Sequence, residues 1–437
     1  QNGLASEPNP GDRGAGLFNY NSSPTLINCT FRNNSASFCG GGLLNYASRS
    51  ILTDCTFTGN SATSFGGGFY DQHDVSETTL VNCAFVDNSA SYGGGVYTSV
   101  GTVLSYCTFT TNAASYGGAV FVNGGSGSGR SSRPSLTGCT FAENSASVHG
   151  GGLHSQYDSN PIINECGFID NVAGYDGGGL STFYSSYPTL TDCTFTGNRA
   201  FGFGGGLSNR HEGGNPTLTR CVFTGNWAVH GGGGMSNHGG SSPALTDCGF
   251  TDNTTNYRGG GMYNGSSSPT LNNTTFIGNY GGNSGGGMYN SSGNPALSGC
   301  AFTQNGAAFN GGGMYNRDTS SPILNDCAFT GNWINYGRVS MYNEEASSPT
   351  LTDCTFTECC QVAPPRSFVD GGGNDYESWC DDCRADVNCR DNAVNAADLG
   401  ILIGVWGTSD PQCDINGDGT VNAADLGLLI GAWGPCQ

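Results

Sequence analysis

Hydrophobic and polar residues alternate along this chain in short runs that recur every 24 to 32 residues. Each repeat holds three runs of strand length, of the types Pro188–Thr191, Cys193–Thr196 and Gly312–Tyr315. Gly, Asn and Asp separate the runs, and the repeats show no sustained helical period. Alternation at every second residue predicts strands that bury one face and expose the other.

The repeats share a Cys-x-Phe-x-x-Asn motif. Thr274 replaces the cysteine in one repeat, and Cys359 replaces the asparagine in the last. The cysteines are Cys29, Cys55, Cys83, Cys107, Cys139, Cys166, Cys193, Cys221, Cys248, Cys300, Cys327 and Cys354. A repeat of about 27 residues cannot bury its own apolar face, so it must stack on its neighbours. The sequence therefore predicts an all-β, right-handed parallel β-helix of about 13 coils, with three strands per coil, over residues 1–358.

Alternation also assigns the interior positions. Leu190, Cys193 and Phe195 are expected to point inward, with Asp192 in a left-handed turn between the first two strands. The third strand carries Leu in several early repeats and Met in later ones, at Met235, Met262, Met288, Met314 and Met341. All five Met of the chain share this position, which favours a core stack over a binding groove. The cysteine column is expected to hold reduced thiols, with disulfides or a metal-binding column as alternatives.

Composition restricts the partners. The net charge is −20, with 14 Arg, no Lys and 34 acidic residues. This balance disfavours binding to nucleic acid phosphates or to an anionic membrane surface. No apolar run approaches 20 residues, so we expect no membrane insertion. Gln1 fits the start of a mature secreted protein after removal of a signal peptide, which predicts an extracellular or cell-surface location.

The Phe-x-x-Asn motif, paired with Gly-Gly-Gly-hydrophobe, resembles the repeats of chlamydial polymorphic membrane proteins and related bacterial right-handed β-helix proteins. The resemblance covers roughly residues 14–358. It implies a secreted or surface-displayed bacterial solenoid.

Composition changes after residue 358, where a linker rich in Cys, Pro, Gly and Asp is expected over residues 359–383. A module follows over residues 384–437. Its second half spaces oxygen-bearing residues as a Ca²⁺ loop does, at Asp414, Asn416, Asp418, Thr420, Asn422 and Asp425. An upstream copy, one residue longer, offers Asp386, Asn388, Asp391, Asn395 and Asp398. We expect Ca²⁺ at both loops and a helix after each.

This tandem resembles type I dockerin modules, in the version carried by secreted proteins of planctomycete-like bacteria. The resemblance implies Ca²⁺-dependent docking to a cohesin-like protein, and a second copy of the chain is an alternative partner. In the family, loop positions 10 and 11 contact the cohesin. Here both copies carry Ala, at Ala396, Ala397, Ala423 and Ala424.

An aromatic stripe is expected on the surface. Tyr263, Tyr289, Tyr315 and Tyr342 follow the Met column in consecutive coils and should stack about 5 Å apart on an exposed sheet. Such a stripe binds sugar rings or another protein, or it only stabilises the sheet.

Catalysis is disfavoured by the residues available. A pectate-lyase-like site needs clustered Asp and a basic residue; Lys is absent, and Glu143 and Asp170 fall at turns. His149 and His230 precede glycines without a supporting acid set. The sequence therefore favours a non-catalytic extracellular structural or adhesive solenoid, tethered through its Ca²⁺-dependent C-terminal module. Head-to-tail assembly into filaments or a surface layer is a further hypothesis for this solenoid. The alternatives are a polysaccharide lyase or hydrolase and a carbohydrate-binding surface protein.

Overall fold

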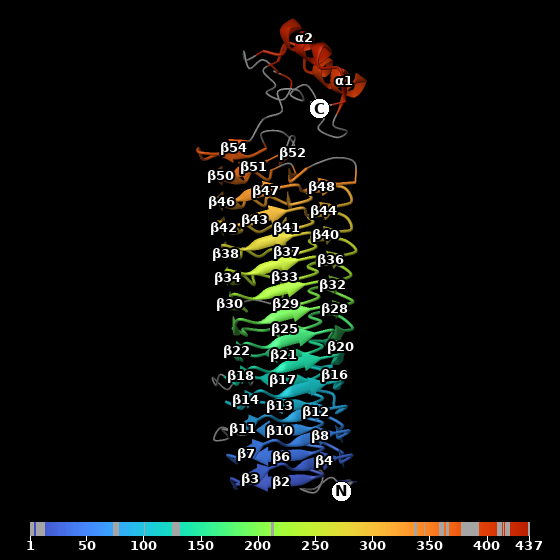
Figure 1. The fold of residues 1–437 in the computed structure, drawn as a ribbon, viewed down its shortest axis with the longest axis vertical. Helices are drawn as coiled ribbons and strands as arrows, with labels where there is room; N and C mark the ends of the chain where they lie inside the picture. The colour runs from blue at the N-terminus through green and yellow to red at the C-terminus, as the bar shows by residue number, and fades with distance from the viewer. Residues whose placement is uncertain are drawn as a thin grey trace.

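A computed structural model describes residues 4–5, 14–72, 78–99, 101–124, 132–210, 214–335, 339–344, 346–357, 362–363, 367–376, 393–408, 413, 415 and 420–435. In these residues the chain forms a long solenoid of parallel strands, with two short helices beyond its C-terminal end (Figure 1). The predicted all-β parallel β-helix is confirmed. No described helix is long and apolar enough to cross a membrane.

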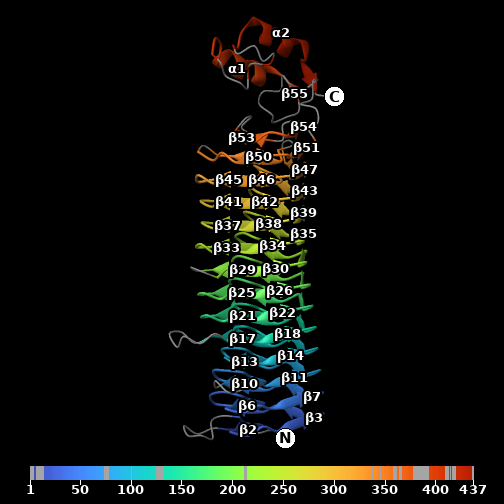
Figure 2. The ribbon, with the colours of Figure 1, turned by 90° about the vertical axis from the view of Figure 1, so that its left-hand side faces the viewer.

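Three parallel sheets, each of 14 strands, run along the solenoid (Figure 2). We name the first two after the residue that their strands bury in most coils, and the third after the five Met that its later strands bury. The leucine sheet contains β3 (Thr25–Ile27), β7 (Ile51–Thr53), β11 (Thr79–Val81), β14 (Val103–Ser105), β18 (Ser135–Thr137), β22 (Ile162–Asn164), β26 (Thr189–Thr191), β30 (Thr217–Thr219), β34 (Ala244–Thr246), β38 (Thr270–Asn272), β42 (Ala296–Ser298), β46 (Ile323–Asn325), β50 (Thr350–Thr352) and β53 (Val369–Asp370).

The second of these is the phenylalanine sheet. Its strands are β4 (Thr30–Arg32), β8 (Thr56–Thr58), β12 (Ala84–Val86), β15 (Thr108–Thr110), β19 (Thr140–Ala142), β23 (Gly167–Ile169), β27 (Thr194–Thr196), β31 (Val222–Thr224), β35 (Gly249–Thr251), β39 (Thr275–Ile277), β43 (Ala301–Thr303), β47 (Ala328–Thr330), β51 (Thr355–Phe356) and β54 (Asp375–Tyr376). In each coil it follows the leucine-sheet strand after a single turn.

The methionine sheet, whose early strands bury Leu, Phe or Val, completes each coil. Its strands are β2 (Leu17–Tyr20), β6 (Leu43–Tyr46), β10 (Phe69–Gln72), β13 (Val96–Thr98), β17 (Val120–Asn123), β21 (Leu153–Gln156), β25 (Leu180–Phe183), β29 (Leu207–Arg210), β33 (Met235–His238), β37 (Met262–Gly265), β41 (Met288–Ser291), β45 (Met314–Arg317), β49 (Met341–Asn343) and β52 (Val362–Ala363).

A fourth set of short strands lies between the phenylalanine and methionine sheets. Nine of them form one sheet, which we call the bridging sheet, and three more pair near the N-terminus. The bridging sheet contains β16 (Ala113–Tyr116), β20 (Ser145–His149), β24 (Val172–Ala173), β28 (Arg199–Ala200), β32 (Trp227–Ala228), β36 (Thr254–Thr255), β40 (Tyr280–Gly281), β44 (Gly306–Ala307) and β48 (Trp333–Ile334). The three others are β1 (Leu4–Ala5), β5 (Ser35–Ala36) and β9 (Ser61–Ala62).

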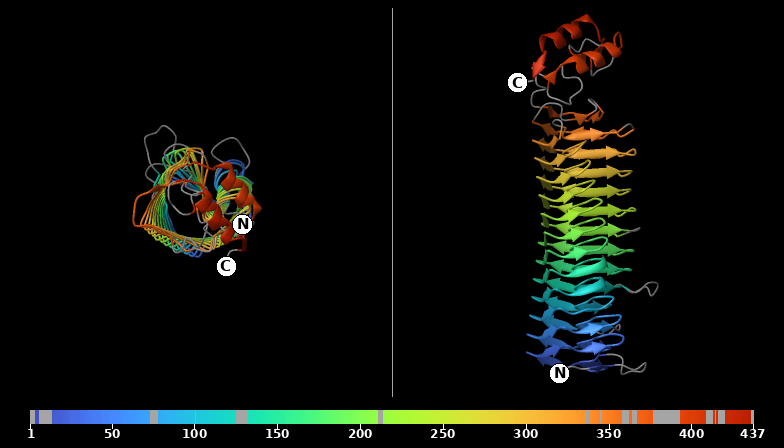
Figure 3. Two further views of the ribbon diagram at one scale, coloured as in Figure 1. Left: turned by 90° about the horizontal axis from the view of Figure 1, so that it is seen from above. Right: turned by 90° about the vertical axis from the view of Figure 1, so that its right-hand side faces the viewer.

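The coils stack on one another along the axis, as Figure 3 shows. The interior side chains repeat their contacts from coil to coil. Leu190, Cys193 and Phe195 are fully buried, and so are all five Met. Phe rings of neighbouring coils stack with centroids 4.6 Å apart at Phe195–Phe223 and 4.7 Å apart at Phe223–Phe250. The described cysteines of the column are free thiols, each donating to backbone carbonyls, as Cys193 does to Ile163 and Thr191.

The Asn of the repeat motif forms a buried ladder. Asn198 donates its Nδ2 hydrogens to Asn226 Oδ1 at 2.9 Å and to the Phe168 carbonyl at 2.9 Å. Its own Oδ1 accepts from the backbone N–H and the side chain of Asn171. Each amide is therefore satisfied by both neighbouring coils, which fixes their register.

The tight turn between the leucine and phenylalanine sheets has the predicted left-handed conformation. Asp192 has φ of 55°, and Asn28, Asp54, Asn82, Asp247, Asp326 and Asp353 at the same repeat position also have positive φ. Asn and Asp adopt this conformation more readily than other side chains.

The solenoid extends beyond residue 358, so the boundary predicted there is too early. Strands β52, β53 and β54 pair with β49, β50 and β51 and form a fourteenth coil inside the predicted linker. The sequence concealed this coil because Val362 stands where earlier coils have Met, and the Phe-x-x-Asn motif is absent.

Candidate functional site

The outer face of the methionine sheet is covered by a second layer of side chains. One column of this layer comes from the strands, and the other comes from the residue before each glycine triplet. The residues of this second column pair from coil to coil, as Phe203 does with Gly231 and Gly231 with Arg258. We call these the strand column and the loop column, and together the outer layer. The outer layer changes character along the solenoid.

In the N-terminal coils the outer layer is aromatic. Tyr97 and Phe121 of the strand column stack at 5.4 Å, and Tyr92 and Tyr116 of the loop column stack at 5.3 Å. The two columns meet edge to face, with Tyr92 at 5.1 Å from Phe121. These rings form a small hydrophobic cluster outside the main core.

In the C-terminal coils the strand column is the predicted tyrosine stripe. Tyr263, Tyr289, Tyr315 and Tyr342 stack with centroids 5.4, 5.0 and 5.5 Å apart. The stacking is as predicted, but the expected exposure is wrong for the two middle rings, because Tyr289 and Tyr315 are only 1% and 5% exposed. Burial raises the pKa of both phenols, Tyr289 and Tyr315.

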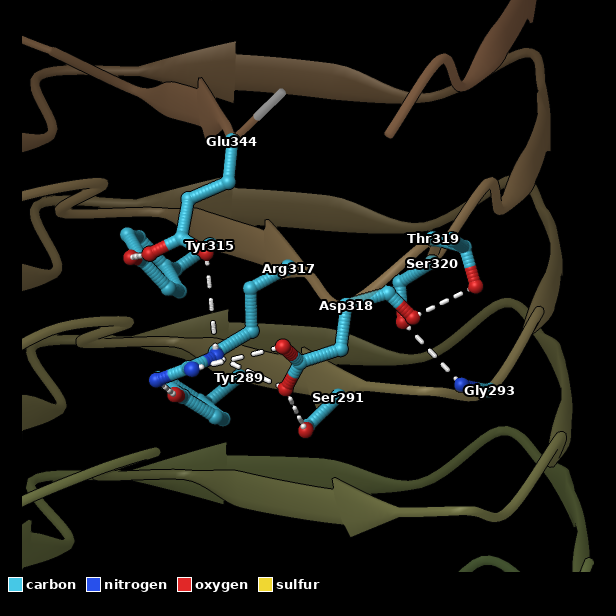
Figure 4. Close-up of polar contacts among 9 residues, drawn as sticks. All are labelled: Tyr289, Ser291, Gly293, Tyr315, Arg317, Asp318, Thr319, Ser320 and Glu344. Carbon is cyan, nitrogen blue, oxygen red and sulfur yellow. Dashed lines mark hydrogen bonds and ion pairs between the residues drawn. The ribbon is translucent and has the colours of Figure 1, made fainter. Parts of the chain in front are cut away.

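Charged side chains cover these rings (Figure 4). Arg317 donates to the Tyr289 hydroxyl at 3.3 Å and to Asp318 at 2.8 Å. Ser291 also donates to Asp318, and the Tyr315 hydroxyl donates to Glu344. The two middle tyrosines are therefore covered by hydrogen-bonded charged side chains. Tyr263 and Tyr342, at the two ends of the stripe, are the more exposed rings.

In the middle coils the strand column loses its rings. Ser181, Ser208 and Ser236 occupy three consecutive coils, and each is fully buried. None of their hydroxyls has a hydrogen-bond partner among the described residues. The layer above them is held by a buried carboxylate, Asp176.

Asp176 organises the middle of the outer layer. Its Oδ1 accepts from the Phe203 backbone N–H at 2.8 Å, and Arg210 lies 3.2 Å from its Oδ2. The guanidinium is at ion-pair distance but out of line for a hydrogen bond to that oxygen. His149 Nδ1 lies 3.5 Å from the same oxygen and accepts from the Asp176 backbone N–H.

Two histidines continue this polar segment toward the N-terminus. His154 occupies the strand column between Phe121 and Ser181 and stacks at 5.3 Å on Phe121. Burial, reinforced by the nearby His149, lowers the pKa of His154 to about 3. His154 is therefore neutral at physiological pH.

A pocket opens at the C-terminal side of the same segment. It is open to solvent, has a volume of about 410 Å³ and is lined by Phe203, His230, Tyr257, Arg258 and Tyr263. The lining residues come from three consecutive coils. Apolar faces with a few convergent polar groups are the usual composition of a small-molecule site.

The acidic and basic residues weighed from the sequence lie elsewhere. Glu143 and Asp170 are exposed at left-handed turns, with φ of 55° and 51°. Three Arg follow one another closely in the sequence of the middle coils. Arg199 lies over Trp227 and Arg220 pairs with Asp192, whereas Arg210 joins the outer layer. Sequence reasoning missed Asp176 and Arg258. Each of them precedes a glycine triplet. The residue type at that repeat position varies from coil to coil, and this variation could have indicated a functional position.

The C-terminal module is a duplicated unit. Helix α1 (Ala396–Gly404) and helix α2 (Ala423–Gly431) begin at Asn395 and Asn422, with capping boxes of nearly identical dihedral angles. Strand β55 (Ala393–Val394), before α1, pairs with β56 (Gly434–Pro435), after α2. The segment after α1 pairs with Val421, before α2, through Gly407 and Thr408. The two halves thus exchange their ends symmetrically around one small core.

The predicted Ca²⁺ ligands fall partly on described residues. Asp398 and Asp425 are fully buried, and each accepts from the N-cap backbone N–H, at 2.9 and 2.8 Å. The Thr420 carbonyl accepts from Asn422 at 2.8 Å. Carboxylate and carbonyl oxygens are the ligand types that Ca²⁺ takes, but the described residues alone bring together no group of three acidic, His or Cys side chains that could hold a metal ion. Asp386, Asn388, Asp391, Asp414, Asn416 and Asp418 lie outside the described residues.

These features define the class of the protein, a right-handed parallel β-solenoid with a small helical module. The chain belongs to the right-handed β-helix family, whose model, described as "Right handed beta helix region", matches residues 9–129, 121–255 and 238–418. No curated protein matches the chain. A solved complex of the alginate lyase AlyF-OU02 with G6 is similar at 11% identity and a TM-score of 0.35, covering 79% of this chain and 82% of that one. A likeness this distant says nothing about activity.

Proposed function

We propose that this chain is a non-catalytic, extracellular structural or adhesive rod of a bacterial surface, tethered through a Ca²⁺-dependent C-terminal module. The carrying observation is the uninterrupted register of the interior. The Asn ladder bonds residue to residue from Asn34 to Asn332 through every described coil between them. A column bonded at every step resists bending and local opening, as a spacer or adhesive rod requires.

The tether is supported by the symmetry of the C-terminal module. Two copies of one capped loop with buried Asp398 and Asp425 fit two hard cations, and the resemblance to dockerins fits a protein partner. Ca²⁺ would hold the loop side chains, and the helices would then present one fixed surface. The partner is a cohesin-like protein, with a second copy of the chain as the alternative.

Calcium titration of the full chain tests the tether. Calorimetry should detect Ca²⁺ binding, and Ca²⁺ should raise the melting temperature of the C-terminal module, because a ligand of the folded state stabilises it. Asp425→Asn should weaken binding at one loop. Asp326→Asn, at a solenoid turn, is the matched control and should leave binding unchanged. Absence of Ca²⁺ binding by the wild type would refute the tether.

Electron microscopy of negatively stained protein, with Ca²⁺ and with EGTA, tests assembly. Head-to-tail filaments in either condition support a building block, and their loss in EGTA would assign the contact to the module. Isolated rods of roughly 67 Å in both conditions, the length of 14 coils at about 4.8 Å each, would refute self-assembly.

The alternative of a polysaccharide lyase or hydrolase is tested separately. Incubation of the full chain with acidic polysaccharides should yield no unsaturated products and no new reducing ends. Release of either product, abolished in an Asp176→Asn variant that still folds, would replace the proposed function with catalysis in the outer layer.

A further inference from the structure

The pocket in the outer layer exists because two bulky positions are missing in one coil. In the loop column, Gly231 lies between Phe203 and Arg258. In the strand column, Ser236 precedes Tyr263. A Cβ at residue 231 would lie 3.0 Å from the Tyr263 ring, so glycine lets this ring tilt beneath the loop. The gap therefore forms where Gly231 interrupts the loop column beside Ser236, the last of the three buried serines of the strand column.

One wall of the pocket is fixed by the buried polar group. Arg210 lies over the Phe203 ring at 5.2 Å, and His238 meets its edge at 4.4 Å. The backbone N–H of Phe203 is held by the fully buried Asp176. Asp176 and Arg210 are thus positioning residues, which keep an aromatic face in place before any ligand arrives.

The other wall carries a cation without a carboxylate partner. Arg258 is half-buried and lies 5.3 Å from the Tyr289 ring, a cation–π contact. Within the described ranges no carboxylate lies at ion-pair distance from Arg258, whereas Arg210, Arg220 and Arg317 are all paired. The pKa of Asp318 is lowered chiefly by its hydrogen bonds from Ser291 and Arg317, and Arg258 adds only a smaller electrostatic contribution. In a chain of net charge −20, a cation without a carboxylate at ion-pair distance, beside an aromatic pocket, fits an anionic ligand.

The remaining lining residues suit a flat ring. Tyr257 is half exposed and stacks on His230 at 5.8 Å, so both rings border the entrance. With Phe203 and Tyr263 they surround the space with aromatic faces, which pack on the C–H faces of a sugar ring. Because the pocket crosses three coils, it can take one residue of a longer chain lying along the rod.

We propose that this pocket binds an anionic pyranose residue of an extracellular polysaccharide, with Arg258 pairing with its carboxylate or sulfate and the aromatic rings stacking on the sugar. The site adds a polymer-binding function to the rod and does not depend on the Ca²⁺ tether. Failure of one proposal therefore leaves the other intact.

Calorimetry on the full chain, at one fixed Ca²⁺ concentration, tests the site with three oligosaccharides of equal length. An oligogalacturonate carries carboxylates, a sulfated galactan oligomer carries sulfates, and a cello-oligosaccharide is neutral. We expect binding of at least one anionic oligomer, weakened by salt, and much weaker binding of the neutral one. Binding of only one anionic oligomer identifies the group that Arg258 recognises.

Two variants connect binding to the pocket. Arg258→Gln should weaken binding of the anionic oligomer about tenfold, because it removes a charge-assisted pair. Arg199→Gln, which removes the Arg that lies 5.0 Å from Trp227 outside the pocket, is the matched control and should bind normally. Equal binding of the neutral oligomer, no binding of either anionic oligomer, or an unchanged Arg258→Gln variant would overturn the proposal.

Discussion

The interior of the solenoid and the outer layer over the methionine sheet are built from the same repeat but tolerate variation very differently. Inside, Phe, Asn and small sulfur or hydroxyl groups recur in nearly every coil, because each side chain must bond or stack in register with two neighbours. Outside, aromatic rings give way to His154, then to Ser181, and return at Tyr263. The first region specifies the rod, and the second is where individual coils differ in chemistry.

The largest effect should come from breaking the interior ladder. Asn198→Leu leaves the backbone N–H and side chain of Asn171 without their acceptor and the Phe168 carbonyl without its donor. With about 1 to 3 kcal/mol for each buried unsatisfied group, we expect a loss of about 5 kcal/mol, measured by denaturant unfolding. The exposed Asn335→Leu is the control. A loss below about 1 kcal/mol would mean that the ladder does not hold the coils.

The outer layer should respond more weakly and according to local packing. Tyr289→Ser recreates the side chain of Ser236 in a coil that is filled by a ring, and we expect a loss of about 3 kcal/mol from the cavity. Tyr289→Phe keeps the stack and loses only the contact to Arg317, so it should lose less than about 1 kcal/mol. Thermal unfolding of the two variants separates packing from the hydroxyl. Equal losses would show that the hydroxyl, and not the stack, is what matters.

The polar middle of the outer layer should make the rod sensitive to acid. The pKa of His154 is about 3 in the folded chain, below its ordinary value of 6.5. As the pH falls below 6.5, the unfolded chain therefore binds a proton that the folded chain does not, and this favours unfolding. Stability is full above pH 6.5 and falls toward pH 3, by roughly 2 to 3 kcal/mol near pH 4.5.

His154→Phe removes this titration and continues the aromatic column of Tyr97 and Phe121. The variant should retain more stability than the wild type in acid and differ little at neutral pH. Unfolding curves across this pH range provide the measurement. Parallel curves for the two proteins would contradict the assignment.

The same contrast explains what the sequence could predict. The interior could be predicted from the sequence because its residue types recur at fixed spacing. The repeat positions of Phe195, Asn198 and Asp192 each have one physical role. The coil of β52–β54 was missed because its residues no longer repeat, although the backbone pairing continues. Asp176 and Arg258 were missed because the residue type at their repeat position changes from coil to coil. Their role depends on contacts with residues about 27 positions away in the neighbouring coils. The exposure of Tyr289 was mispredicted because alternation gives the side of a sheet but not what covers that side.

The smallest effect should come from the cysteine column, where the interior itself offers a natural exchange. Thr274 occupies the cysteine position in one coil, is fully buried and donates to the Asn272 carbonyl, as Cys300 donates to the Ser298 carbonyl. Cys300→Thr should therefore cost less than about 1.5 kcal/mol, because the bond and the volume are both nearly conserved. Cys300→Phe adds volume to a filled core and should be far more destabilising, which makes it the comparison in the same unfolding experiment. A large loss for Cys300→Thr would mean that sulfur contacts along the column, and not its small size, hold the interior together.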